Sequence, residues 1–242
     1  MLQTIITFLK KQSFQPGPLG ILVNPFYFIR RSLFKNIKLF STDLQGRLLD
    51  FGCGRKPYRS LFNHVSEYIG VDIEQTGHDH TNSLVDIYYN GKTIPLPDNS
   101  FDAVFCSEVI EHIFNVDEIM PELHRVLKPG GKILITVPFC WNEHEIPYDF
   151  GRYTSFGIKH VMEKNGLEVI KFKKSGSFSY VNFQLWALYI YETLGIIKPK
   201  KLRYILSMLF IMPINIIGTI ICAILPRNNS MYFNNVLVAR KK

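Results

Sequence analysis

The central part of the chain alternates short apolar runs with polar turns and helix-like segments. Apolar runs with the length and composition of buried strands occupy residues 47–50, 68–72, 101–106 and 132–137, and a short helical stretch at 109–112 follows the third of them. Helical spacing recurs in 118–127, closed by Lys128-Pro129-Gly130-Gly131, and in 155–165, closed by Gly166. Residues 167–173 and 235–239 have the pattern of two further strands. This alternation predicts an α/β fold with a doubly wound, mostly parallel sheet.

The two ends of the chain mix apolar and basic residues instead. Residues 1–11 and 25–40 have the spacing of amphipathic helices. Residues 180–197 are rich in aromatic side chains, and 204–225 follow as 22 residues without a charge. As a helix, that last segment would be about 33 Å long, which is sufficient to cross a bilayer. We therefore expect an apolar helical insertion before the last strand.

A single membrane crossing by 204–225 would separate the strand 235–239 from the sheet that it should complete. We expect instead that 180–197 and 204–225 form a hairpin that dips into the membrane or lies in its interface. Pro213 and Asn215 favour a broken, shallow arrangement, and the alternative is two helices packed on the domain as a lid or a dimer face. The predicted organisation is an N-terminal segment of basic amphipathic helices (1–46), the α/β domain (47–178 and 231–242) and the apolar hairpin (179–230).

The net charge of +8 is unevenly distributed along the chain. It amounts to +6 over residues 1–49, −8 over 50–163 and +10 over 164–242. Basic arms that are also apolar suit an anionic membrane surface at least as well as nucleic acid. The four cysteines form no CxxC pair, and no cleavable signal peptide is evident. We therefore expect a cytoplasmic protein, peripheral or monotopic on the cytoplasmic face of the membrane.

A glycine-rich loop follows the first strand, and an acid ends the second. Gly52 and Gly54 lie in the turn after Asp50, where glycine lets the backbone approach a ligand closely. Asp72 follows Asp50 by 22 residues, the separation at which an acid reaches the hydroxyls of a ribose. Arg55-Lys56-Pro57 replaces the third glycine of a dinucleotide-binding loop. A cofactor with a ribose but no pyrophosphate therefore suits the loop better than NAD.

Four blocks of sequence resemble one family. Leu48-Leu49-Asp50-Phe51-Gly52-Cys53-Gly54 is similar to motif I of the class I S-adenosylmethionine-dependent methyltransferases, and Tyr68-Ile69-Gly70-Val71-Asp72 to the segment after it. Residues 94–112 and 123–131 resemble the "lPf.d.sFD.V…evleH" and "RVLKPGG" blocks of the type 11 subgroup. The resemblance implies a Rossmann-like sheet with an antiparallel last strand inside it, S-adenosylmethionine as cofactor, and methyl transfer as activity.

The resemblance also implies roles for individual residues. Asp50, Gly52 and Gly54 would line the methionine end of the cofactor, with Cys53 in the loop. Asp72 and Ile73 would hold the ribose, Asp86 and Ile87 fall at the adenine contacts, and Ser107 and Glu108 would face the cofactor. A solvated loop acid is the alternative for Asp86. For Glu108 the alternative is an exposed helix charge, and for Glu111 we expect that exposed charge.

The segment 138–154 follows a strand at the edge of the sheet where α/β proteins bind ligands. It resembles the "HE.P.DF.RYT" stretch of a subset of the family. His144 is the candidate general base, because the ordinary pKa of histidine lies near neutrality. Glu145, Asp149, Arg152 and Tyr153 are candidates for the acceptor pocket. The alternative is that His144 and Arg152 only fix the loop.

The candidate functions differ in acceptor and in class. We expect a methyltransferase acting at the membrane surface on a lipid-linked sugar or surface-glycan precursor, because type 11-like enzymes of this shape resemble those of envelope polysaccharide synthesis. The alternatives are a soluble small-molecule or quinone-type methyltransferase, and a scaffold that binds S-adenosylmethionine without turnover. Nucleic acid is disfavoured as acceptor, since Ser107-Glu108-Val109-Ile110 replaces the D/N-P-P-Y/F/W motif. A metal site could form from Cys53, Cys106 and Cys140 with His112 and His144 in reach. No metal site is expected, because free cysteines are more commonly small buried apolar residues.

Overall fold

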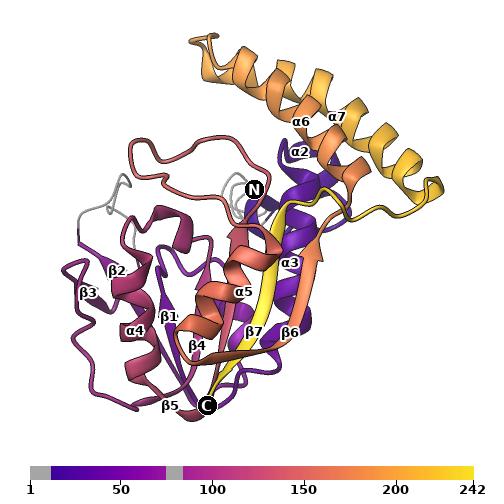
Figure 1. Ribbon diagram of the computed structural model, residues 1–242. Helices are drawn as coiled ribbons and strands as arrows, with labels where there is room; N and C mark the ends of the chain where they lie inside the picture. Colours follow the sequence, from indigo (N-terminus) through magenta and orange to yellow (C-terminus); the bar gives the residue numbers. More distant parts are fainter. Residues whose placement is uncertain (1–11, 75–83) are drawn as a thin grey trace. The chain divides into compact units, whose positions relative to one another are not determined.

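The computed structural model describes residues 12–74 and 84–242 and confirms the α/β architecture (Figure 1). Seven strands form one sheet in the order β3-β2-β1-β4-β5-β7-β6. The strands are β1 (Arg47–Phe51), β2 (Glu67–Ile73), β3 (Ile87–Tyr89), β4 (Phe101–Ser107), β5 (Leu127–Pro138), β6 (Leu167–Ser175) and β7 (Asn234–Lys241). The chain order reverses between β1 and β4, which is the position where open α/β sheets bind their ligands.

The last strand lies inside the sheet, as the family resemblance implies. β7 pairs antiparallel with β5 from Lys132↔Arg240 to Pro138↔Asn234. Val236–Ala239 are fully buried, because helices or loops cover both faces of the sheet at this position. The predicted antiparallel strand is therefore confirmed.

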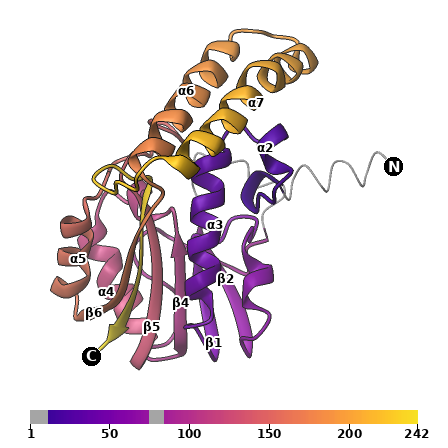
Figure 2. The ribbon, with the colours of Figure 1, turned by 90° about the vertical axis from the view of Figure 1, so that its right-hand side faces the viewer.

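Two helices cover one face of the sheet and form its main core. They are α4 (Val116–Val126) and α5 (Ser155–Lys164), which lie on the same side of the sheet (Figure 2). Met120 and Leu123 of α4 and Ile158 and Met162 of α5 join one buried cluster with the strands. α4 ends at Val126, close to the predicted end, and the residues after it are extended within β5 rather than forming a separate turn.

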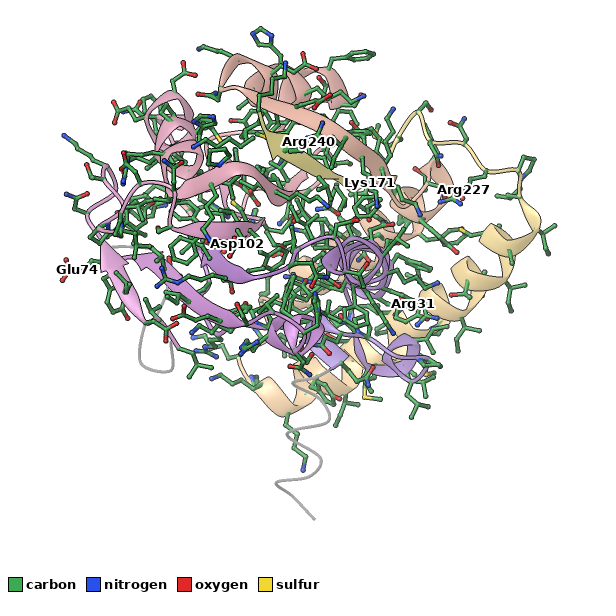
Figure 3. The ribbon with its side chains drawn as sticks, turned by 90° about the horizontal axis from the view of Figure 1, so that it is seen from below. Arg31, Glu74, Asp102, Lys171, Arg227 and Arg240 are labelled. Atoms are coloured by element: carbon green, nitrogen blue, oxygen red, sulfur yellow. The ribbon has the colours of Figure 1, made fainter. Side chains whose placement is uncertain are left out.

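Ion pairs join neighbouring strands at the amino ends of the parallel strands, the edge viewed in Figure 3. Asp102 in β4 bonds Lys128 at 2.7 Å and accepts the backbone N–H of Arg47 at 2.8 Å. Arg240 in β7 bonds Glu168 in β6 at 2.8 Å. These charges are largely exposed, so they contribute to strand register more than to stability.

Contacts between residues divide the chain into two units. The sheet unit contains residues 36–174 and 234–242, and the described part of the helical unit contains 12–35 and 175–233. The helical unit holds α2 (Gly20–Val23), α6 (Phe178–Leu194) and α7 (Lys200–Ile224), whereas α3 (Tyr27–Ser41) crosses the division. α6 and α7 form an antiparallel hairpin (Figure 1), so the expected apolar helical insertion is confirmed.

The expected break in α7 is wrong. α7 continues through Pro213 as one helix of 25 residues, although proline removes one backbone hydrogen bond. Asn215 is buried, and its side-chain N–H groups donate to the carbonyls of Ile21 and Asn24 at 3.1 Å each. Packing and these hydrogen bonds within the helical unit keep α7 continuous at Pro213. The partners of Asn215 come from a distant segment, so the sequence pattern does not reveal them.

Candidate active site

The glycine-rich turn is tied to the neighbouring strand by its backbone. Gly52 and Cys53 donate their N–H groups to the carbonyl of Val71 at 2.8 and 3.2 Å. Gly52 and Gly54 have φ of +72° and +48°, values that favour glycine. A Cβ on Gly52 would lie 2.3 Å from a methyl carbon of Val109, whereas a Cβ on Gly54 would meet nothing within 4 Å. Gly52 is therefore required by packing, and Gly54 borders open space.

Asp72 lies directly beside this turn at the end of β2. One carboxylate oxygen accepts the N–H of Gly54 at 2.8 Å, and the other accepts the N–H of Ile73 at 2.8 Å. The structure thus brings the glycine turn into contact with Asp72, which follows Gly54 by 18 residues. The contacts of Asp72 and Ile73 with a ribose remain predictions.

Asp50 is buried beneath the turn and has a partner that the sequence analysis missed. The hydroxyl of Tyr68 donates to its carboxylate. Burial raises the pKa of Asp50 to about 7, although the Tyr68 hydrogen bond opposes the rise. The sequence does not predict this hydrogen bond, because an aromatic residue in a strand such as 68–72 indicates only side-chain packing. Cys53 is also buried, and burial raises the pKa of its thiol.

Asp86 is exposed but not merely solvated. Its carboxylate accepts the N–H of Gly70 at 2.6 Å and pairs with the Lys56 ammonium at 2.5 Å. Burial is the largest single effect and opposes ionisation, but the hydrogen bonds from these two donors and the nearby positive charges together hold the pKa of Asp86 below its ordinary value. Ile87 follows in β3, beside Val71 of β2. The adenine contacts of Asp86 and Ile87 remain predictions.

Ser107 and Glu108 belong to a hydrogen-bonded chain at the carboxyl end of β4. The hydroxyls of Ser107 and Thr136 lie 2.8 Å apart, and Thr136 donates to Glu108 at 2.7 Å. Asn234 donates to the second Glu108 oxygen at 2.6 Å. Glu108 has φ of +55°, an uncommon conformation for a residue with a side chain. Its carboxylate is therefore fixed at the edge of the sheet rather than free on a helix surface.

The expected exposure of Glu111 is wrong, because its side chain is fully buried. The residues after Glu108 form a 3-10 turn, Ile110–His112, instead of an exposed helix. Phe150 donates its N–H to the carbonyl of Glu111 at 2.8 Å, so the segment 138–154 covers this turn. Burial first, and the charge of Glu108 second, raise the pKa of Glu111 well above its ordinary value.

His144, Asp149 and Arg152 lie together in the segment 138–154. Arg152 donates to both carboxylate oxygens of Asp149 at 2.6 Å, and Asp149 also accepts the backbone N–H of His144 at 2.9 Å. The Nδ1 atom of His144 lies 3.1 Å from Asp149. Burial, and then the nearby charge of His112, lower the pKa of His144. Asp149 and Arg152 hold the loop together, and an acceptor role for them remains a prediction.

The remaining acceptor candidates lie on either side of this loop. Tyr153 is half-buried and packs against the core, whereas Oε2 of Glu145 lies 3.6 Å from Nε2 of His112. The rings of His112 and His144 are in edge contact, with centroids 4.8 Å apart. From the sequence, His112 is only a possible partner of the cysteines, since it reads as one more residue of a helical stretch.

Comparison with known proteins identifies this part of the chain. Residues 49–135 match the family described as a methyltransferase domain, type 11. The central stretch of the chain thus resembles a type 11 methyltransferase domain. This match supports S-adenosylmethionine as the methyl donor. Its position at the open side of the Gly52–Gly54 turn remains a prediction.

Relatives of the type 11 domain cover only part of the chain. A probable S-adenosylmethionine-dependent methyltransferase of Mycolicibacterium smegmatis is 32% identical over 136 residues, 54% of this chain and 51% of that protein. The ubiquinone/menaquinone biosynthesis C-methyltransferase UbiE of Pseudoalteromonas translucida is 35% identical over 81 residues, 32% of this chain and 31% of that protein. The chain thus spans about half the length, or less, of these relatives.

Solved structures support the fold. The [4+2]-cyclase SpnF superimposes with a TM-score of 0.55 at 19% identity, covering 86% of this chain and 81% of that one. Phosphoethanolamine N-methyltransferase 2 of Haemonchus contortus, bound to S-adenosylhomocysteine, gives 0.54 at 19% identity, covering 92% and 56%. Since a cyclase and a methyltransferase share this fold, the fold alone does not define the reaction.

Proposed function

We propose that the protein transfers the methyl group of S-adenosylmethionine to an acceptor bound at the carboxyl edge of the sheet. The observation that carries this proposal is the contact of Asp72 with the N–H of Gly54, within a domain of the type 11 family. That contact supports the proposal because the acid that we propose for the ribose lies beside the open side of a glycine turn. The sulfonium is already activated, so the protein's main task is to hold the acceptor and the methyl group in line.

The proposed roles follow the motif. Asp50, Gly52, Cys53 and Gly54 lie at the methionine end of the cofactor, and Asp72, Ile73, Asp86 and Ile87 at its nucleoside. Ser107 and Glu108 stand at the edge between cofactor and acceptor. Glu145, Asp149, Arg152 and Tyr153 shape the acceptor side. His144 is the base for an acceptor hydroxyl, and burial, which lowers its pKa, favours the neutral form that a base needs.

The proposed acceptor is a lipid-linked sugar or surface-glycan precursor, methylated at the membrane surface. The composition of the helical unit supports membrane contact. Its described part carries eight Lys or Arg residues against one acid, Glu192. By length and composition α7 could cross a membrane, and many of its apolar side chains are exposed, among them Leu209, Ile220 and Ile224. A core helix of a soluble protein would bury them.

A pocket inside the helical unit supports the same partner class. It has a volume of about 460 Å³, and Arg30, Lys200 and Arg203 line it together with apolar and aromatic side chains. No acid lines it. Asn215 also borders it with a buried Oδ1 that has no hydrogen-bond partner among the described residues. Three cations among apolar side chains fit an anionic amphiphile, such as a phosphate-bearing lipid.

A quinone-type acceptor is the second candidate. The similarity to UbiE favours it, because that relative's name states C-methylation in ubiquinone and menaquinone biosynthesis. Such an acceptor is also apolar and membrane-borne. Incubation of the protein and labelled cofactor with each lipid class, followed by mass spectrometry of the lipids, distinguishes the two.

Calorimetric titration with S-adenosylmethionine and S-adenosylhomocysteine tests the cofactor site. We expect micromolar binding to the wild type and a loss of at least a hundredfold in Asp72→Ala, because the ribose loses its acceptor. Asp117→Ala, which removes an exposed acid of α4, is the matched control and should bind normally. A folded wild type that binds neither compound would overturn the proposal in favour of a non-catalytic scaffold.

A further inference from the structure

Glu111 is the feature of the sheet unit that methyl transfer leaves unexplained. Its side chain has no solvent exposure, and neither carboxylate oxygen has a hydrogen-bond partner among the described residues. Native proteins pair buried carboxylates, because an isolated buried charge is strongly unfavourable. The Glu108 carboxylate nearby adds a second negative charge, which makes ionisation of Glu111 harder still. A cation at this position would resolve both problems.

Two histidines, His112 and His144, lie beside the carboxylate of Glu111. The Nδ1 atom of His112 lies 2.6 Å from the carbonyl of Tyr148, and Nδ1 of His144 lies 3.1 Å from Asp149. Each oxygen can accept the Nδ1–H, which leaves the lone pair on Nε2. The Nε2 atom of His112 is buried and has no hydrogen-bond partner among the described residues. Metal-binding histidines are commonly oriented by an oxygen on the far ring nitrogen in this way.

The spacing of these groups fits ligands around one ion. One ligand atom each from Glu111, His112 and His144 lie within 4.8 Å of one another. Nε2 of His112 is 3.8 Å from Oε1 of Glu111, which is too long for a hydrogen bond. Two ligands about 2.1 Å from a tetrahedral ion lie roughly 3.4 Å apart, so a small closure of the site accommodates one.

We propose that Glu111, His112 and His144 bind a divalent first-row transition-metal ion, with Glu145 beside the open coordination position. Two imidazoles and one carboxylate suit zinc, manganese, iron or cobalt better than magnesium or calcium. Three protein ligands leave a position for a further oxygen, as catalytic metal sites do. This proposal departs from the expectation that the chain binds no metal.

The chemical role of the ion rests on the proposed function. The cluster follows β4 at the carboxyl edge of the sheet, where the cofactor turn also lies. An acceptor hydroxyl bound to the ion would release its proton to solvent more readily. Its oxygen would then take the methyl group, while the C–S bond of the cofactor breaks and its electron pair returns to sulfur. His144 would in that case be a ligand and not a free base.

Cobalt is the probe for this site, because Co²⁺ bound by histidine absorbs visible light. We expect the chelator-treated wild type to take up one Co²⁺ per chain with micromolar affinity, read by its absorption bands and by elemental analysis. Glu111→Gln and His144→Ala should each weaken uptake at least tenfold. The matched controls are Glu118→Gln and His160→Ala, which change exposed residues of the same types.

Folding and cofactor binding are measured on the same variants. Glu111→Gln replaces a buried carboxyl group that has no hydrogen-bond partner among the described residues by an amide that cannot ionise. Its metal-free form should therefore melt no lower than the metal-free wild type, and only the wild type should gain stability with Co²⁺. Binding of S-adenosylhomocysteine should survive in both variants, which separates this site from the cofactor pocket. A folded wild type that takes up no Co²⁺, or uptake unchanged in Glu111→Gln and His144→Ala, would overturn the proposal. Co²⁺ uptake without any cofactor binding would leave the metal site standing and remove the proposed methyl transfer.

Discussion

Two glycines with the same backbone conformation allow a residue-scale test of the cofactor turn. Gly52 and Gly130 have φ of +72° and +76°, but only a Cβ on Gly52 would collide with a neighbour, Val109. Gly130→Ala should therefore cost only the left-handed strain, about 1–2 kcal/mol. Gly52→Ala should cost more than this and should weaken cofactor binding, because the turn must shift.

Urea unfolding of both variants and titration with S-adenosylhomocysteine measure these effects. Equal losses of stability, with cofactor affinity intact in both, would show that the packing of Val109 does not position the turn. The contrast also explains what the sequence reveals at this scale. A glycine after a strand predicts a tight turn, whereas the neighbour that makes it irreplaceable comes from a segment more than fifty residues away.

Burial of single polar residues was the least predictable property. Asp50 and Asp72 follow from motif spacing, and the structure places both beside the turn. Glu111 was expected on a surface, because an acid beside valine and isoleucine in a short periodic stretch is typical of a helix face. The positive φ of Glu108 redirects the chain into a 3-10 turn and sends Glu111 inward. That conformation has no sequence signal, since glutamate seldom adopts it.

At the scale of elements, Thr154 defines where α5 begins. Its Oγ1 accepts the N–H of Gly157 at 3.0 Å, which satisfies one free donor of the first turn. Thr154→Ala should reduce the free energy of unfolding by about 1 kcal/mol. Thr154→Ser keeps the hydroxyl and should therefore retain most of the free energy of unfolding that Thr154→Ala loses. Thermal or urea unfolding gives both values, and a loss as large in the serine variant would assign the effect to the methyl group instead of the cap.

Elements were predictable in type and less so in extent. Each predicted strand is present, because short apolar runs bounded by glycine and charged residues usually form buried strands in an α/β domain. The helix α4 ends at Val126, but Lys128–Gly131 continue as strand with a shifted register between Phe101 and Ala103. Pairing with β4 determines that these residues are extended. The Lys-Pro-Gly-Gly pattern predicts only that the helix ends. Pro213 is the converse case, where packing outweighs a local helix breaker.

At the scale of the whole molecule, charge is divided between the two units. The described part of the helical unit has a net charge of +7, whereas residues 36–174 and 234–242 together have −1. The net charge summed over segments of the sequence reveals basic arms at both ends of the chain. They do not show that residues 12–35 pack with 175–233, which depends on buried contacts such as that of Gln184 with the N–H of Phe28 at 3.1 Å.

This division predicts how the protein binds vesicles. Lys198, Lys200 and Lys201 are exposed in the helical unit, and each lysine near an anionic surface contributes about 1 kcal/mol. Replacing all three by Gln should therefore weaken binding to phosphatidylglycerol vesicles by up to roughly a hundredfold. Lys92, Lys164 and Lys242 are exposed in the sheet unit, and their replacement by Gln removes the same charge with little expected effect.

Co-sedimentation at two salt concentrations provides the measurement, since screening should reduce wild-type binding to anionic vesicles. Leu209→Ser with Ile220→Ser, two exposed apolar positions of α7, should weaken binding to anionic and zwitterionic vesicles alike. Equal losses in the two lysine triples would mean that net charge alone attracts the protein to the surface. A wild type that stays in solution with every lipid would remove the membrane from the proposal and favour an acceptor that reaches the sheet unit from water.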